Sequence, residues 1–129
     1  MPDTITERNI ATVRRLCEHW NTLDAAGIAA LMTPDCDYRN VPVAGDRHIG
    51  PAAAHALLSH VSAEWEVGLE ILHIVGDANV VLAERNEHFV HRAGAKPSFQ
   101  LPVMGTFEMR DGRIHAWRDY FELSHAKFA

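Results

Sequence analysis

The first half of the chain places apolar side chains at the three- and four-residue intervals of amphipathic helices. The longest run includes Val13, Leu16 and Trp20, which would share one face of a helix. Thr33-Pro34 ends a second, shorter helical pattern, because proline cannot donate a backbone hydrogen bond. The pattern predicts helices over 4–22 and 25–32, an extended segment over 36–43, and a third helix that opens at Pro51.

The second half alternates apolar and polar residues with the two-residue period of half-buried strands. Turn-forming residues separate these runs at 76–79, at 93–97 and at Asp111-Gly112, which is typical of a hairpin turn. Pro102 indicates a bulge or an edge. The pattern predicts strands over 65–71, 80–91, 99–109 and 114–123.

Helices followed by a meander of long antiparallel strands are typical of an α+β domain. A long sheet of this kind curls. We therefore expect a cone-shaped, curved mixed sheet with three or more helices covering its concave face and enclosing a pocket. The 129 residues suit a single domain spanning 1–129. This length excludes an α/β-hydrolase or a (β/α)₈ barrel, which need about twice as many residues.

The net charge and the cysteine content limit which classes of binding partner and which cellular compartment are expected. The net charge of −5, without a basic cluster, argues against nucleic acid and anionic membranes as partners. No signal peptide is predicted, and no apolar run is long enough to span a membrane. Cys17 and Cys36 are interpreted as buried thiols of a cytoplasmic protein. The nine histidines form no metal-binding motif, so we predict no metal site.

The last predicted strand carries a carboxylate on its apolar face. Five of its residues share one side: His115, Trp117, Asp119, Phe121 and Leu123. Because Trp117 and Phe121 are large aromatic residues, we expect this side to face the interior. A lone carboxylate buried there would either cost stability or have a raised pKa.

The strand predicted over 80–91 shows the same anomaly. Arg85 and Glu87 are two residues apart, so they share a face with Ala83 and Phe89. If this face is also interior, Asp119 could reach them from a neighbouring part of the sheet. Arg85 would then neutralise one carboxylate and the other would hold a proton, giving one base and one acid at neutral pH. A structural ion network, or simple exposure of this face, is the alternative interpretation.

Two more polar residues lie on the predicted extended segment. Tyr38 and Asn40 point the same way because they are two residues apart. A phenol and an amide on a pocket wall can hold a water molecule through complementary donor and acceptor contacts. Tyrosine and asparagine near a turn are also common for purely structural reasons.

Three motifs together resemble limonene-1,2-epoxide hydrolase: Tyr38-x-Asn40-x-Pro42, Arg85-x-Glu87 and Trp117-Arg118-Asp119-Tyr120-Phe121. The last motif, with the Asp111-Gly112 turn before it, is the most specific, and the resemblance spans nearly the whole chain. It implies the cone-shaped fold shared by nuclear transport factor 2, ketosteroid isomerase and SnoaL-like polyketide cyclases. It also implies a homodimer and one-step opening of an epoxide by water, without a cofactor.

The resemblance gives each of these residues an expected role. Asp119 resembles the base that deprotonates water, Tyr38 and Asn40 resemble the groups that hold this water, and Arg85 resembles the bridge between two carboxylates. Glu87 stands where the family has an aspartate as the acid, and its extra methylene would place the proton differently. The strand pattern adds four expected substrate-binding residues: Phe89, Leu101, Val103 and Phe121.

The sequence therefore predicts an epoxide hydrolase that converts a small apolar epoxide, for example a cyclic or terpenoid one, to a vicinal diol. A first alternative is a proton-transfer enzyme of the polyketide cyclase or ketosteroid isomerase type, with Asp119 as the base. A second is a ligand-binding or dimerisation module without catalysis. Divergence of Arg85, Glu87 and Asp119, or exposure of Tyr38 and Asn40, would favour this second alternative.

Overall fold

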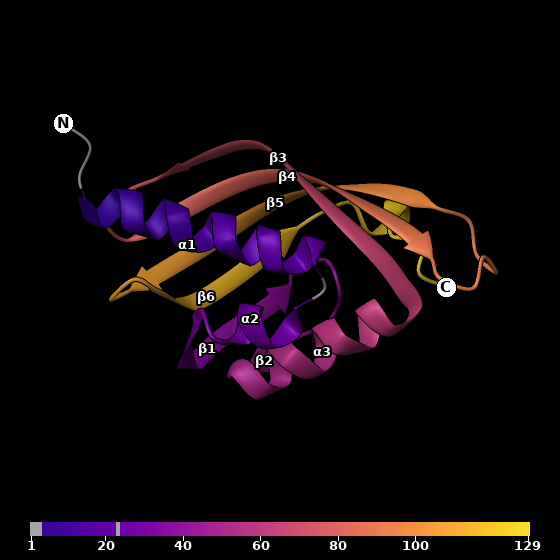
Figure 1. Cartoon of the computed structure of the whole chain (residues 1–129), viewed down its shortest axis with the longest axis horizontal. Coiled ribbons are helices and arrows are strands. Elements are labelled where there is room, and N and C mark those ends of the chain that lie inside the picture. Colours follow the sequence, from indigo (N-terminus) through magenta and orange to yellow (C-terminus); the bar gives the residue numbers. More distant parts are fainter. Residues whose placement is uncertain (1–3, 23) are drawn as a thin grey trace.

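A curved, six-stranded sheet carries the helices on its concave side (Figure 1). The computed structural model describes residues 4–22 and 24–129. The helices are α1 (Thr4–Asn21), α2 (Ala25–Ala29), α3 (Pro51–Glu64) and the short 3₁₀ helix η1 (Leu123–His125). The strands are β1 (Met32–Asn40), β2 (His48–Ile49), β3 (Trp65–Gly76), β4 (Val80–His91), β5 (Phe99–Arg110) and β6 (Arg113–Tyr120). This arrangement confirms the predicted α+β class with a curved mixed sheet.

The strands follow the order β2-β1-β6-β5-β4-β3. Strands β3 to β6 form the predicted antiparallel meander, whereas β1 lies parallel to β6. The parallel pairing aligns Tyr38 with Trp117 and Asn40 with Asp119. The side chains of Tyr38 and Asn40 therefore lie next to those of Trp117 and Asp119, although the two strands are far apart in the chain.

Two turns of the meander are formed by the residues that predict them. Asp111 and Gly112 have φ angles of 52° and 78°, as a type I′ hairpin turn requires. Asp77 Oδ1 accepts hydrogen bonds from the backbone N–H groups of Asn79 (2.8 Å) and Val80 (2.9 Å). These local turns help to set the register of β3 to β6.

The start of β1 differs from the sequence prediction, because Met32 belongs to the strand and not to the second helix. The cause is a tertiary contact. Met32 pairs with Ile114, whose N–H donates to the carbonyl of Leu31 (2.9 Å). The strand tolerates Pro34 because the β1–β6 ladder is irregular between Met32 and Asp37. No ladder hydrogen bond requires the N–H that proline lacks at this position.

The last strand also departs from prediction near both ends. A register shift between β5 and β6 turns Ile114 into the core in place of His115. The strand ends earlier than predicted, and Leu123 lies in η1 with its side chain half exposed. Between these points Trp117 and Asp119 are buried, as the alternation predicts.

Pro102 lies at a local edge of the sheet, as its residue type predicts. β5 pairs with β6 only from Met104 onwards, so at Pro102 it has β4 as a neighbour on one side alone. β3 continues to Gly76, further than predicted, and the two-residue β2 has no counterpart in the sequence prediction.

The core lies between the sheet and α1, which buries Val13, Leu16 and Trp20 against it. Cys17 and Cys36 are buried and unpaired, which confirms their interpretation as buried thiols. Burial raises the pKa of Cys17 to about 11 and that of Cys36 to about 12. Both thiols therefore stay protonated at neutral pH.

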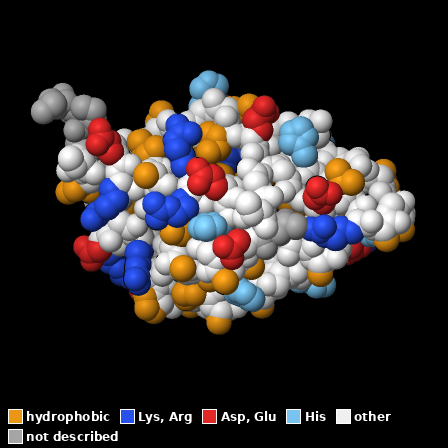
Figure 2. Space-filling view, in the orientation of Figure 1, with side chains coloured by type: hydrophobic (Ala, Val, Ile, Leu, Met, Phe, Trp, Pro, Cys, Tyr) orange, Lys and Arg blue, Asp and Glu red, His pale blue; other side chains and the backbone are white. Residues whose placement is uncertain are grey.

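Most charged side chains lie on the surface. Figure 2 shows Lys and Arg gathered toward the end of the molecule that holds the start of α1, with Asp and Glu among them. Ion pairs on the surface are partly exposed, as in Arg47–Asp37 (2.8 Å), and such pairs contribute about 0–1 kcal/mol. Arg85, Glu87 and Asp119 are buried instead. Within the described residues, no helix has the length and apolar character needed to cross a membrane.

Candidate active site

One guanidinium nitrogen joins two buried carboxyl groups. Arg85 Nη2 donates hydrogen bonds to Glu87 Oε2 (2.8 Å) and to Asp119 Oδ2 (2.9 Å). The Arg85 side chain is fully buried, and those of Glu87 and Asp119 are 8% and 7% exposed. The three residues that the sequence analysis groups together therefore converge in the interior.

A glycine on the intervening strand makes room for this contact. Gly105 on β5 pairs with Ala83 on one side and with Asp119 on the other. A Cβ atom at Gly105 would overlap Arg85 Nη1 and would lie 3.0 Å from Asp119 Oδ1. Sequence reasoning missed Gly105; the available signal is a glycine inside a strand, which often marks a close approach of other groups.

The carboxylate of Asp119 is held at both oxygens. Trp117 Nε1 donates to Oδ1 (2.8 Å), while Arg85 donates to Oδ2. The Trp117 ring stacks on Tyr38, with 3.8 Å between centroids and 11° between ring planes. Packing and hydrogen bonds together therefore fix the orientation of Asp119.

Burial shifts the pKa of Glu87 and that of Arg85. It raises the pKa of Glu87; the charge of Arg85 opposes this rise and that of Asp119 adds to it. Burial also lowers the pKa of Arg85, but the charges of Asp119 and Glu87 outweigh it, so the pKa is raised and the guanidinium stays charged. Glu87 is therefore a carboxyl group with a raised pKa, whereas Asp119 accepts hydrogen bonds from two donors.

Tyr38 and Asn40 lie on β1, next to the strand β6 that carries Asp119. Burial raises the pKa of Tyr38 well above 10, the charges of Asp119 and Glu87 add to it, and a hydrogen bond from Asn40 opposes it. The phenol is therefore neutral and can donate a hydrogen bond. Asn40 is bound from behind by Asp46, whose Oδ2 accepts from the Asn40 backbone N–H (2.8 Å) and from Nδ2 (3.2 Å).

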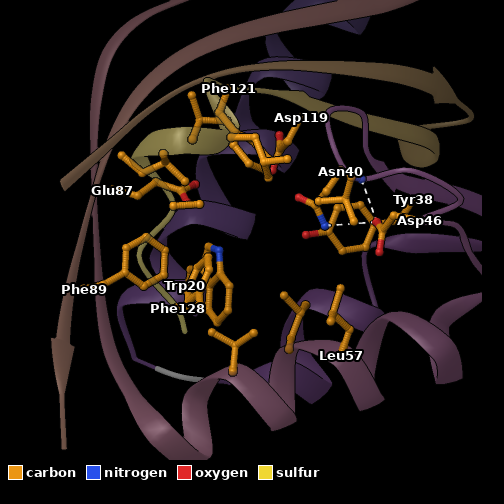
Figure 3. A pocket seen from close by; sticks show the side chains of 17 residues that line it. Trp20, Tyr38, Asn40, Asp46, Leu57, Glu87, Phe89, Asp119, Phe121 and Phe128 are labelled. Carbon is orange, nitrogen blue, oxygen red and sulfur yellow. Dashed lines mark hydrogen bonds between the residues drawn. The ribbon is translucent and has the colours of Figure 1, made fainter. Parts of the chain in front are cut away.

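These polar groups border an apolar cavity of about 280 Å³ (Figure 3). Tyr38, Asn40, Glu87 and Asp119 all line the cavity, whereas Arg85 lies behind its wall. The four predicted substrate-binding residues also line it: Phe89, Leu101, Val103 and Phe121. The sequence analysis missed further wall residues, including Trp20, Asp46, Leu57, Leu58, Val61 and Phe128. The apolar stripe of α3 is visible in the sequence, but such a stripe does not distinguish a cavity wall from solid core.

Two of the histidines contact carboxyl groups outside the Arg85 cluster. His48 Nε2 lies 2.9 Å from Asp46, and His91 Nε2 lies 3.0 Å from Glu64. Among residues 4–22 and 24–129, no three His, Cys, Asp or Glu side chains gather in a way that could hold a metal ion.

Known proteins share this fold and part of this sequence. The chain is 34% identical over 108 residues to epoxide hydrolase EphG of Mycobacterium tuberculosis (strain ATCC 25618 / H37Rv). This match covers 82% of the chain and 64% of EphG, so the chain spans less than two thirds of that relative's length. The solved structure of an M. tuberculosis LEH-like epoxide hydrolase has a TM-score of 0.80 at 28% identity, covering 93% of this chain and 86% of that chain.

A putative polyketide cyclase from Xanthomonas campestris pv. campestris has a TM-score of 0.83 at 24% identity, covering 97% of this chain and 99% of that chain. This likeness shows the fold alone. Residues 7–126 match the limonene-1,2-epoxide hydrolase catalytic domain, which confirms the resemblance seen in the sequence motifs. The chain belongs to the limonene-1,2-epoxide hydrolase family.

Proposed function

We propose that this protein is an epoxide hydrolase that adds water to a small apolar epoxide and releases a vicinal diol. The observation that carries the proposal is the position of Asp119 and Glu87 around Arg85 Nη2, at the wall of an apolar cavity. Epoxide opening needs help at both ends, because water is a weak nucleophile and an alkoxide is a poor leaving group. One base and one acid on the same cavity wall meet this need.

Asp119 is the proposed base. Its carboxylate removes a proton from a water molecule held by Tyr38 and Asn40, and the water oxygen forms a bond to an epoxide carbon. The hydrogen bonds from Trp117 and Arg85 keep the carboxylate in one orientation. A positioned base of this kind typically contributes about 10²–10⁴-fold in rate.

Glu87 is the proposed acid. As the ring carbon–oxygen bond breaks, Glu87 transfers its proton to the departing oxygen, which completes the diol. Asp119 then carries the proton of water and Glu87 is ionised, so a proton must return from Asp119 to Glu87 before the next turnover. Arg85 contacts both groups and can neutralise whichever one is charged.

The extra methylene of Glu87, relative to the aspartate of the family, leaves the carboxyl bridge intact. Glu87 Oε2 is 2.8 Å from Arg85 Nη2, and the residue lines the cavity. This geometry supports Glu87 as the acid, whose longer side chain would change which epoxides fit productively.

A panel of small apolar epoxides, cyclic and terpenoid ones included, tests this function. We expect diol from at least one substrate, and we expect Asp119→Asn to abolish it without a large change in melting temperature. The proposed chemistry uses no cofactor, so EDTA should leave the activity unchanged. Turnover of ketones in place of epoxides would favour a proton-transfer enzyme, and binding without turnover would favour a ligand-binding module; either result would overturn the proposal.

A homodimer and a cytoplasmic location belong to the same proposal. Apolar side chains on the outer face of the sheet support self-association, among them Leu82, Met104 and Tyr120, which are about 40% exposed. Light scattering after size-exclusion chromatography should give twice the mass of the chain. A monomer at micromolar concentration would contradict the dimer.

A further inference from the structure

Asp46 lies behind Asn40, in the segment that joins β1 to β2. Its Oδ2 accepts hydrogen bonds from both nitrogens of Asn40, and its Oδ1 lies 2.9 Å from His48 Nε2. The Asp46 side chain is 17% exposed and lines the cavity together with Asn40. Figure 3 shows the two hydrogen bonds as dashed lines, with Asn40 between Asp46 and the side of the cavity that holds Glu87.

The Asp46 carboxylate determines whether the nitrogen or the oxygen of the Asn40 side-chain amide faces the cavity. An ionised carboxylate accepts hydrogen bonds and donates none, so Nδ2 of Asn40 must face Asp46. Burial raises the pKa of Asp46, but the hydrogen bonds from Asn40 and the contact with His48 outweigh it, so the pKa is lowered and the group stays ionised. The Asn40 oxygen is therefore free to accept a hydrogen bond from a molecule in the cavity.

We propose that Asp46 is a positioning residue for the hydrolysis, because it holds the Asn40 amide with its oxygen toward the attacking water. The inference rests on the proposed function. Neither the strand alternation nor the motifs point to Asp46, which reads in the sequence only as part of a turn.

The hydrogen-bonding capacity of water shows why this orientation matters. Water has two O–H donors and two lone pairs. With Asp119 and the Asn40 oxygen accepting its protons and Tyr38 donating to one lone pair, the second lone pair is free to attack carbon. An amide turned the other way would donate from Nδ2 to that second lone pair, which would weaken the nucleophile and remove an acceptor.

The activity test compares Asp46→Ala with Asp37→Ala. The methyl group introduced by Asp46→Ala accepts no hydrogen bond, so the Asn40 side chain would no longer be held in one orientation. We expect kcat to fall about ten-fold, as the loss of one ordering hydrogen bond implies, with KM changed less than two-fold. Asp37 is adjacent to Tyr38 in sequence but pairs with Arg47, so its variant should keep the wild-type kcat. A folded Asp46→Ala protein with wild-type kcat, or with a loss confined to KM, would overturn the proposal.

A measurement on the wild-type protein tests the hydrogen bond without depending on turnover. In ¹⁵N-labelled protein, one side-chain amide proton of Asn40 should be shifted downfield and protected from solvent exchange. Asp46→Ala should return it to the values of a free asparagine. A free-like Asn40 amide in a wild-type protein that forms diol would overturn the role of Asp46 alone. Absence of diol from the wild type, with the amide protected, would overturn the proposed function and leave the hydrogen bond in place.

Discussion

Gly105 lies directly opposite Asp119 in the ladder between β5 and β6, and the Arg85 guanidinium occupies the space that a side chain at 105 would fill. β5 separates the strand that carries Glu87 from the strand that carries Asp119. Contact between the two carboxyl groups through Arg85 therefore depends on the absence of a side chain at this one position.

Gly105→Ala should break the contact that Arg85 makes with Glu87 and Asp119, while the protein still folds. A methyl group there would push against Arg85 Nη1 and crowd Asp119, and fully buried Arg85 has little room to move. A displacement of about 1 Å at a reacting group costs on the order of 100-fold, which is the expected fall in kcat/KM. Gly68→Ala is the matched control, since a Cβ at Gly68 would meet no atom within 4 Å. Equal activity in both variants would contradict this role for Gly105.

Arg85→Met should be strongly destabilising, because it leaves two carboxyl groups buried without a cation. Breaking a buried ion pair by removing one partner costs about 3–5 kcal/mol. Arg47→Met, which breaks the exposed pair with Asp37, should cost at most about 1 kcal/mol. Urea unfolding monitored by tryptophan fluorescence gives both values. Similar losses in the two variants would show that the buried cluster does not depend on Arg85 in this way.

Glu87 should give both stability and activity a pH dependence. Because its pKa is raised in the folded protein, the native state holds a proton that the unfolded chain releases above the ordinary value of 4.5. The native state then binds more protons, so this group makes the free energy of unfolding fall as pH rises from about 4.5 toward the native pKa. Activity should fall over the upper part of this range as the acid loses its proton.

Glu87→Gln removes the titrating group. Its free energy of unfolding should lack this decline with pH, and its kcat should be lower by about 10²–10⁴-fold, the usual contribution of a positioned acid. Denaturation curves of the wild type and the variant between about pH 4.5 and about pH 8 provide the comparison. Parallel stability profiles would show that Glu87 has an ordinary pKa.

Side-chain alternation predicts which residues of the central cluster share a face, and the cluster itself follows if both faces are interior. A strand has a fixed period of two, so Arg85 and Glu87 had to share a face with Phe89, and Asp119 had to share one with Trp117. Local turn chemistry also set the start of β4, since Asp77 binds its own turn. These features depend on neighbouring residues, which a sequence displays directly.

Features that depend on distant contacts were not predictable in this way. Met32 continues a helical pattern in the sequence but lies in β1, because β1 pairs with β6. The register shift between β5 and β6 places Ile114, and not His115, on the inner face. Gly105 contacts residues of the two neighbouring strands, and its only signal in the sequence is a glycine inside a strand. Asp46 binds Asn40 across a turn, and the path of that turn is not visible in the pattern of residues.

Direct attack by a water molecule that Asp119 activates is the central claim, and a single-turnover reaction in ¹⁸O-water tests it most directly. Excess enzyme is mixed with a small apolar epoxide that the enzyme converts, and the diol is analysed by mass spectrometry. One-step attack predicts that the diol of the first turnover carries one ¹⁸O atom, and that Asp119→Asn forms no diol. Unlabelled diol in the first turnover, with ¹⁸O entering only later, would show that a protein carboxylate attacks the epoxide and would contradict the account.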